Sequence, residues 1–294
     1  MAHVMAEKQK NIELRKESNK GRRFSKKALI YLLLVIYGLV NAYPMFWMFL
    51  NSFKSNIDFA KNPFGLPVQW LFDNYKTAWE TAKLGTYFFN SVIVSVAAVA
   101  VTIFAGAIAS YFLARFAFKW GKMVYAFFVF GMLIPIHATL VPMFLLMKSL
   151  GLLNTHLGLI LPYIAFNLPI TIFILVSFMK SFPRDIEESA IMDGCGVFRI
   201  FFSIILPMTR PALATVIILN FINNWNEFSF ALVLINDDSL KTLPLGLANF
   251  AGQFTTNYGA QMAGLTMAVI PVIIIYLLLE DHLVKGMTAG AVKG

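Results

Sequence analysis

The sequence has little charge and almost no cysteine, and both shortages narrow the class of protein. Charged residues make up 13% of its 294 residues, whereas soluble domains average about 25%. Hydrophobic residues make up 59%, and 29 residues are Phe. A chain with so little polar surface is predicted to be an integral membrane protein. The single cysteine, Cys195, excludes a disulfide framework and any cysteine-based metal site.

Groups arranged for catalysis are missing as well. The sequence holds no G-x-x-x-x-G-K-[ST] loop, so the chain is not expected to bind ATP in the usual way. It has no Ser/His/Asp set, and its four histidines are too scattered to form a ligand cluster: His3, His137, His156 and His282. The sequence therefore predicts no catalytic residue, no metal site and no cofactor in this chain.

The sequence does contain a series of long apolar runs. Residues 28–53 form an uncharged run of 26 residues, enough to cross a bilayer about 30 Å thick at about 1.5 Å per residue. This run is too long for the apolar region of a signal peptide. With the later runs it predicts an all-α polytopic membrane protein with six transmembrane helices. The later runs are 88–114, 123–147, 157–179, about 25 residues from Pro211, and 264–279.

Two mixed segments are expected on the outer side of the membrane. Residues 54–87 include DNYKTAWETAKLG, which predicts a short amphipathic helix, and residues 236–258 are expected to form a polar loop. Within the first span, Pro44 is expected to kink or end the helix. Small residues in the second span favour close helix packing: Gly106, Ala107, Ala109 and Ser110.

The distribution of basic residues orients the spans. With the N-terminus inside, the inner segments hold 18 of the 24 Lys and Arg residues and the outer segments hold 6. This bias satisfies the positive-inside rule with both termini in the cytoplasm. Residues 1–27, with nine Lys or Arg against three Glu, are expected to be a disordered or surface-lying tail near membrane lipid. A nucleic-acid-binding arm is the alternative for the net charge of +9, but the distribution of that charge argues against a nucleic-acid partner.

The segment 183–207, PRDIEESAIMDGCGVFRIFFSIILP, is a charged interruption between apolar runs. So polar a segment cannot lie in hydrocarbon and must sit at a membrane surface. It predicts two short helices, because Pro183 precedes acids of a first turn and a glycine pair, Gly194 and Gly196, breaks the helix. Pro207 ends the second helix or kinks it into the next one. Helical spacing predicts one apolar face from Phe198, Phe201, Phe202 and Ile205.

The spacing within this segment resembles the coupling loop of ABC-importer permeases. That pattern is Glu-Ala-Ala, three residues, Gly, nine residues, Ile, one residue, Leu-Pro. It is matched here, with Ser189 as the one departure, by Glu188, Ser189, Ala190, Gly194, Ile204, Leu206 and Pro207. The resemblance implies a cytoplasmic helix-turn-helix that docks on a separate ATP-hydrolysing subunit, and we call residues 183–207 the coupling segment. A plain amphipathic connector without a partner is the alternative.

The resemblance also implies roles for single residues of the coupling segment. Glu188 would pair with a basic residue of the ATPase, Ala190 would allow close approach, and Gly194 would make the turn between the two helices. Asp193, Leu206 and Pro207 belong to the same coupling site.

A second polar group lies inside the predicted fifth span. NFINNWNEFSF places Asn224, Trp225, Asn226 and Glu227 at membrane depth, where polar groups are costly and usually face a cavity or a protein neighbour. We expect them to line a translocation path or to brace a partner permease, and aromatic rings with amides suit a sugar. The alternative for Glu227 is a place near the outer interface, with its carboxylate reaching water. The Trp-Asn-Glu string and TLPLGL (residues 242–247) resemble carbohydrate-uptake permeases.

Two weaker signals have competing interpretations. The tail 285–294 resembles the end of maltose-type permeases, which implies a second ATPase contact through Thr288, Gly290 and Lys293; a frayed end is the alternative. His137, between Pro135 and Pro142, is either a proton relay or, as we favour, a helix-packing residue.

The resemblance covers residues 28–294 and implies a type I ABC-importer permease fold, with the six-helix domain over residues 28–284. The implied protein is a multi-pass permease of a bacterial or archaeal inner membrane that imports a sugar, with an oligosaccharide as the first expectation. The implied partners are a second permease in a heterodimer, two ABC ATPase subunits that hold ATP and Mg, and an extracytoplasmic sugar-binding protein. The alternatives are a monosaccharide or glycerol phosphate as the cargo, an ion-driven secondary transporter, and a membrane scaffold.

Overall fold

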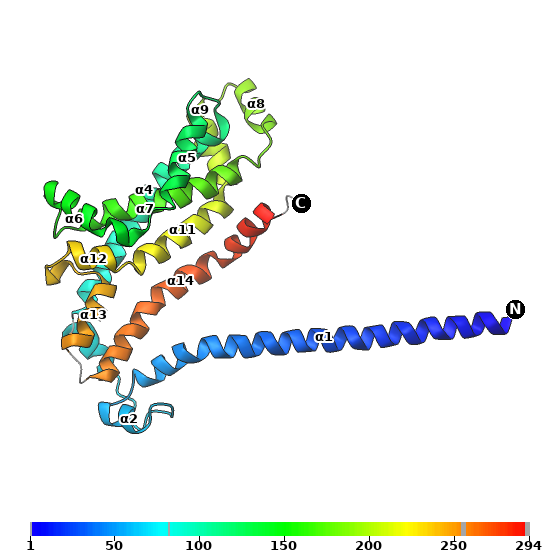
Figure 1. Ribbon diagram of the computed structural model, residues 1–294, viewed down its shortest axis with the longest axis horizontal. Helices are drawn as coiled ribbons and strands as arrows, with labels where there is room; N and C mark the ends of the chain where they lie inside the picture. Colours follow the sequence, from blue (N-terminus) through cyan, green and yellow to red (C-terminus); the bar gives the residue numbers. More distant parts are fainter. Residues whose placement is uncertain (1, 82, 254–256, 292–294) are drawn as a thin grey trace.

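Long helices and bent helix pairs make up the structure, a computed structural model that describes residues 2–81, 83–253 and 257–291 (Figure 1). Side chains are described for residues 27–81, 83–248 and 257–280. In this part of the chain, four helices are long and apolar enough to cross a membrane. They are α1 (Ala2–Asn51, apolar from Lys27), α4 (Leu84–Arg115), α7 (His156–Met179) and α14 (Tyr258–Ala291).

Two further stretches could each cross a membrane as a bent pair of helices. α5 (Gly121–Gly131) meets the run formed by η2 (Ile136–Thr139) and α6 (Leu140–Ser149) at 95°. The run Val197–Met208 meets α11 (Arg210–Trp225) at 76°. By length and composition, the described residues therefore contain four candidate membrane spans, or up to six if each bent pair is one span. This confirms an all-α polytopic architecture, while the count of six stays a prediction.

The third predicted span, 123–147, is not one continuous helix, and whether it crosses the membrane as one bent span stays a prediction. α5 ends at Gly131, and helical structure resumes only at Ile136, directly after Pro135. Proline has no N–H to donate and disfavours helical geometry in the residue before it, so a break in the helix is favoured at this position. Pro142 is tolerated because it lies in the first turn of α6, where its missing N–H removes no helical hydrogen bond.

The fifth predicted span, about 25 residues from Pro211, is not one continuous helix either. α11 has 16 residues and ends at Trp225, and a separate helix, α12 (Ser229–Leu234), follows. The bend at the other end of α11 falls at Thr209, just after Pro207, as the sequence predicts. The chain is therefore interrupted at the position of its most polar intramembrane residues.

Helix α1 contradicts the expectation of disorder at the N-terminus, while a place at the membrane surface stays a prediction. The backbone is helical from Ala2, where we expected a disordered or surface-lying tail over residues 1–27, and the helix continues through Pro44 to Asn51. The first residues are rich in Ala, Glu, Lys, Arg and Gln, which are good helix formers. In Figure 1, α1 meets the other helices only near its C-terminal end, and its side chains from Lys27 to Phe46 are exposed.

The core centres on the close packing of α4 against α7. Gly106 of α4 is buried, and a Cβ added there would lie 2.6 Å from Cγ2 of Thr171 on α7. Ala107 and Ser110 are buried on the same helix, whereas Ala109 is half-buried. This confirms that the small residues of the second span serve close helix contact.

A compact cap joins the helix ends opposite the coupling segment, and we call it the outer cap after the side of the membrane that the sequence predicts for it. It contains α2 (Asn56–Lys61), α3 (Asp73–Lys76), the π-helical turn η1 (Thr77–Thr81) and α13 (Leu243–Gln253). α3 and η1 confirm the short helix predicted in DNYKTAWETAKLG. Residues 236–258, expected to be a polar loop, instead include α13, because Leu243 and Leu245 are buried and Gly246 leaves no room for a Cβ against Tyr87.

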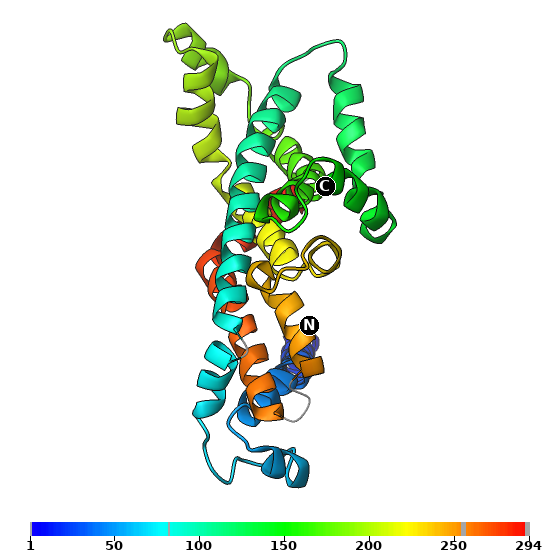
Figure 2. The same ribbon diagram turned by 90° about the vertical axis from the view of Figure 1, so that its left-hand side faces the viewer.

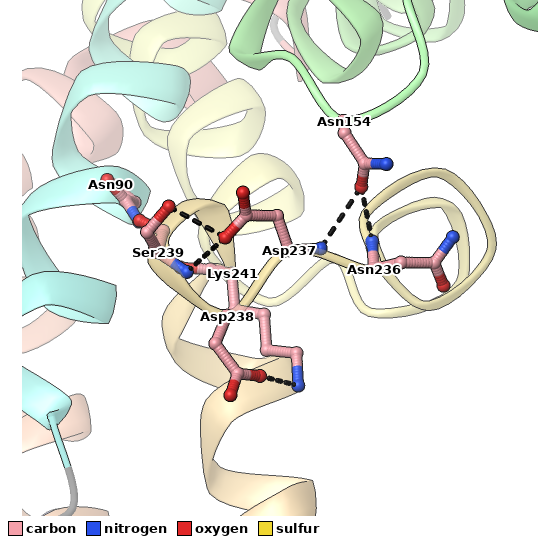
Figure 3. Close-up of polar contacts among 7 residues, drawn as sticks. All are labelled: Asn90, Asn154, Asn236, Asp237, Asp238, Ser239 and Lys241. Atoms are coloured by element: carbon pink, nitrogen blue, oxygen red, sulfur yellow. Dashed lines mark hydrogen bonds and ion pairs between the residues drawn. The ribbon is translucent and has the colours of Figure 1, made fainter.

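Hydrogen bonds hold the loop before α13 in place (Figure 3). The side-chain oxygen of Asn154 accepts from the backbone N–H groups of Asn236 and Asp237, at 2.6 and 3.1 Å. Asn90 of α4 donates to the carbonyls of Ser239 and Lys241, at 2.8 and 2.9 Å. The loop is exposed, yet its backbone is fixed from two sides.

A buried lysine marks the junction of α1 with the outer cap. Lys54 is fully enclosed, and its Nζ donates to the carbonyl of Asn62 at 2.6 Å. Burial lowers the pKa of the Lys54 ammonium, and the nearby Asp58 carboxylate acts in the opposite direction. The carbonyl of Lys54 accepts from Asn74 at 3.0 Å, and Gly259 of α14 packs against it.

The C-terminal contact predicted for the tail falls largely outside the described residues. α14 continues to Ala291, so residues 285–291 are helical in backbone. The side chain of Thr288, the surroundings of Gly290 and the whole of Lys293 lie outside the described part.

Replacing Gly106 by Val should destabilise the fold, because its side chain would overlap Thr171. Overpacking of this kind costs about 1–3 kcal/mol. The same change at Gly38 of α1, which has no atom within 4 Å of its Cβ position, is the control. Thermal unfolding of the two purified variants in detergent should show a lower midpoint for Gly106→Val only. Equal midpoints would contradict close α4–α7 packing.

Candidate functional site

The coupling segment forms a helix-turn-helix at one extreme end of the molecule (Figure 2). Its first helix is α8 (Asp185–Met192), with three acids in its first turn. The second begins as α9 (Val197–Ile200) and continues through the π-helical turn η3 (Phe201–Ile205) into α10 (Leu206–Met208). The predicted pair of short helices, broken near Gly194 and Gly196, is confirmed.

The turn between these helices explains the spacing from Ala190 to Gly194. The N–H of Cys195 donates to the carbonyl of Ala190, and the N–H of Gly194 donates to the carbonyl of Ile191, both at 2.9 Å. This pair of bonds closes a helix with a Schellman motif, which requires a left-handed residue after the last helical turn. Gly194 occupies that position with φ of 80°, where a side chain would be strained.

The outer surface of the coupling segment combines charge with exposed apolar side chains. Glu188, Ser189 and Asp193 are exposed, whereas Ala190 is buried against the body. Beside them, Met192 is 88% exposed and Ile191 is 58% exposed. Apolar side chains that project from a polar segment mark an interaction surface.

The predicted single apolar face of the second helix is wrong. Phe201 and Ile205 are buried, but Phe198 is 70% exposed and Phe202 is exposed as well. A π-helical turn has more residues per turn than an α-helix, so the spacing used for the prediction does not hold across η3. The helix therefore presents one aromatic group inward and another outward.

An ion pair that the sequence does not reveal joins the coupling segment to α4. Arg115, the last residue of α4, pairs through Nε with Oε1 of Glu187 on α8. Its Nη1 donates to the carbonyl of Phe182 at 3.1 Å. These residues are far apart in sequence and carry no recognisable spacing.

The second candidate site is a cavity of about 490 Å³ beside the break after α11. Its wall combines aromatic rings with side-chain amides. The residues that line it are Ile134, Ile136, Tyr163, Phe166, Asn167, Ile222, Asn223, Asn224, Asn226, Glu227, Phe228, Ser229 and Phe230. They come from α7, α11, the start of α12 and the break before η2, so both helix interruptions border this cavity.

Three polar pairs connect α7 with α11 and the residues that follow it. Tyr163 donates to Glu227 at 2.7 Å, and Asn167 donates to Asn224 at 2.6 Å. Deeper along the same face, Asn220 donates to Thr171 at 2.8 Å. Because the three α7 residues are four apart, they lie on one helix face. The two outer pairs line the cavity, and the inner pair holds the helices together below it.

The structure gives Glu227 a role that neither sequence interpretation anticipated. Its carboxylate accepts from the backbone N–H groups of Phe230 at 2.7 Å and Ala231 at 3.2 Å, as well as from Tyr163. These N–H groups belong to the first turn of α12, where a negative charge is favourable. Glu227 therefore caps α12 and is fixed in the cavity wall.

Trp225 and Asn226 point in different directions. Trp225 is 2% exposed, donates from Nε1 to the carbonyl of Ala268 on α14 at 3.0 Å, and stacks on Phe221. It does not line the cavity. Asn226 is exposed at the cavity edge, next to Asn223. The aromatic lining comes instead from Tyr163, Phe166, Phe228 and Phe230, which no sequence pattern singles out.

His137 lies in η2, at the start of the second half of the bent pair formed by α5 and the run η2–α6, and is exposed. Among the described residues, no group of three or more His, Cys, Asp or Glu side chains is placed to hold a metal ion.

Comparison with known proteins decides the family. Residues 102–289 match the model of the binding-protein-dependent transport system inner membrane component. The chain belongs to this family of permeases.

Several relatives of this permease carry the names of carbohydrate uptake systems. It is 38% identical over 281 residues to the diacetylchitobiose uptake system permease protein NgcG of Streptomyces coelicolor, covering 95% of this chain and 92% of that protein. It is 31% identical over 276 residues to the melibiose/raffinose/stachyose import permease protein MelC of Bacillus subtilis, covering 94% and 100%. A chain from the crystal structure of a bacterial ABC transporter that imports the acidic polysaccharide alginate superposes with a TM-score of 0.74 at 26% identity, covering 87% of this chain and 95% of that one.

The turn of the permease's coupling segment can be tested with a matched pair of variants. Gly194 and Gly196 both have free space around a Cβ, but only Gly194 has a positive φ. Ala at Gly194 should cost about 1–2 kcal/mol and loosen the turn, while Ala at Gly196 should not. Hydrogen exchange at the Gly194 and Cys195 amides should rise about 5- to 30-fold in Gly194→Ala alone. Equal exchange rates in the Gly194→Ala and Gly196→Ala variants would show that the positive φ is not the reason for glycine at position 194.

Proposed function

We propose that this chain is one of two transmembrane subunits in an ATP-driven, binding-protein-dependent importer of a neutral oligosaccharide. The observation that carries the proposal is the coupling segment. It is a closed helix-turn-helix at the end of the molecule, with exposed apolar side chains next to Glu188. A separate ABC ATPase subunit is the partner for this surface, and that subunit holds ATP and Mg.

Different residues of the coupling segment have different roles in the contact with the ATPase. Glu188 pairs with a basic residue in the groove of the ATPase, and Met192 and Ile191 fill its apolar part. Buried Ala190 lets α8 lie close to the body, and Gly194 sets the angle of the second helix. Ser189 and Asp193 complete the polar rim, and Leu206 and Pro207 lead into the bend before α11.

The same proposal fixes the orientation in the inner membrane. The coupling segment and both termini lie in the cytoplasm, in line with the excess of Lys and Arg in those segments. The outer cap then faces an extracytoplasmic sugar-binding protein, and the exposed apolar length of α1 faces lipid or the second permease. The C-terminal tail, through Thr288, Gly290 and Lys293, adds a second contact with the ATPase.

The cavity supports a neutral carbohydrate as the cargo. Its lining, all within the described residues, contains no Lys, Arg or His, and its one acid, Glu227, is already bonded three times. Glycerol phosphate or an acidic sugar would need cationic groups to replace its hydration. Aromatic rings stack on a sugar face, and the amides of Asn223, Asn224 and Asn226 pair with hydroxyl groups. Trp225 braces the wall from behind.

The bonding of Glu227 also argues against an ion-driven secondary transporter. Such a transporter needs an ionisable group that exchanges protons or ions during the cycle. The Glu227 carboxylate already accepts hydrogen bonds from the Phe230 N–H in the first turn of α12 and from the Tyr163 hydroxyl. In the proposed cycle, ATP binding closes the ATPase pair, the coupling segments move with it, and the cavity changes the side to which it opens.

Reconstitution with candidate partners tests this function. The chain should be purified with a second permease, the ATPase and a binding protein, and ATPase rates measured across neutral and anionic sugars. Stimulation by a neutral oligosaccharide is expected. Stimulation by an anionic cargo would contradict the cargo assignment, and sugar uptake driven by an ion gradient without ATP would contradict the importer mechanism.

Charge reversal at Glu188 tests the docking surface separately. Glu188→Lys should reduce co-purified ATPase about tenfold, since one charge-assisted contact contributes about 1.4 kcal/mol or more. The control is Glu80→Lys, the same change at an exposed residue of the outer cap. Equal retention of the ATPase by both variants would place the contact elsewhere.

A further inference from the structure

Adjacent acids on α8 face opposite ways. Glu188 is exposed, whereas the Glu187 side chain is 15% exposed and turned toward the body of the protein. Its partner Arg115 is 4% exposed. A guanidinium and a carboxylate so far removed from water are stabilised only by each other and by nearby polar groups. Glu187 is therefore not part of the surface proposed to meet the ATPase.

The Arg115 side chain holds three parts of the protein at one point. The residue ends α4, its Nε pairs with Glu187 on α8, and its Nη1 donates to the carbonyl of Phe182 in the link from α7 to α8. Of the residues in α8, only Ala190 is buried. Apart from its chain connections and Ala190, α8 is thus attached to the helices through Glu187, which pairs with Arg115 and also lies beside Tyr111 of α4.

The second half of the coupling segment has its own attachments. Phe201 packs on Tyr111 of α4 with ring centroids 5.1 Å apart, and the run from Val197 passes through Thr209 into α11. Loss of the ion pair would therefore leave the segment attached through apolar packing while α8 loses its direct hold on α4. The two halves lead to different walls of the cavity: α9 leads to α11, and α8 leads through Arg115 to α4 and α7.

The α4–α7 pair is packed closely enough to move as one body. Gly106 lies against Thr171, and further along α7 Asn167 and Tyr163 line the cavity. A displacement of α8 passed to the end of α4 would reach these residues through close-packed helices. Without that link, a displacement of the coupling segment would act mainly through α11.

We propose that Arg115 and Glu187 form the joint through which movement of α8 is transmitted to α4 and α7, so that both walls of the cavity respond to the ATPase. Both are positioning residues: they touch neither cargo nor ATPase. This inference rests on the proposed function, because it presupposes an ATPase that moves the coupling segment.

The test uses the complete reconstituted importer in proteoliposomes. The variants are Glu187→Gln, Arg115→Gln and the swapped pair Arg115→Glu with Glu187→Arg, with Glu188→Gln as the neighbouring control. Three quantities are measured: the amount of ATPase bound, its rate with loaded binding protein, and the sugar imported per ATP hydrolysed.

The single variants are expected to keep the bound ATPase and its hydrolysis but to import at least about fivefold less sugar per ATP, the lower range of coupling between sites. The swapped pair should recover most of the wild-type ratio. Glu188→Gln should instead lose bound ATPase.

If the single variants import as much sugar per ATP hydrolysed as the wild type, the proposed joint is refuted. Loss of bound ATPase in Glu187→Gln equal to that in Glu188→Gln would also refute it, since Glu187 would then belong to the docking surface. If a single variant fails to insert, the swapped pair decides, and a folded swapped pair that stays uncoupled refutes the proposal. Failure of the unaltered chain to bind any ATPase would count against the proposed function itself.

Discussion

Hydrocarbon offers no hydrogen-bonding partner, so every polar group at membrane depth must find one within the protein. The pairs between α7 and α11 follow from this constraint. Tyr163, Asn167 and Thr171 each meet a polar side chain from α11 or from the break just after it. Separating the two helices would leave these groups unpaired. The three polar pairs therefore determine how α7 and α11 lie together. The cavity opens beside the outer pairs.

The same constraint explains where the backbone is irregular. Broken helices are tolerated at membrane depth where they border a cavity or are covered by protein. The interruption before Ile136 and the one after Trp225 both border the cavity, through Ile134 and Ile136 on one side and Asn226 and Phe228 on the other. At the second break, the Glu227 carboxylate supplies the partners that the first N–H groups of α12 need. The irregular backbone and the candidate path therefore occur together.

Local signals in the sequence predicted much of the architecture but not its side-chain pairing. The helices α4 and α7, the helix break at Gly194 and the bend after Pro207 all follow from apolar length, glycine or proline. The breaks at Pro135 and Asn226 were missed because a high average hydropathy hid them. The pair Arg115 and Glu187 and the capping by Glu227 depend on tertiary contacts, which no spacing encodes. The inward turn of Phe201 depends on a π-helical turn that helical periodicity does not anticipate.

The central claim is that the coupling segment is a cytoplasmic docking surface. The most direct test labels Met192→Cys with a membrane-impermeant maleimide, in a Cys195→Ser background, using Val68→Cys of the outer cap as the control; both positions are highly exposed. In inside-out vesicles, Met192→Cys should react when the permease is alone and become protected when the ATPase is bound. Val68→Cys should react only from the opposite side, with or without ATPase. Reaction of Met192→Cys at the same rate in both states, or from the outer side, would contradict the account.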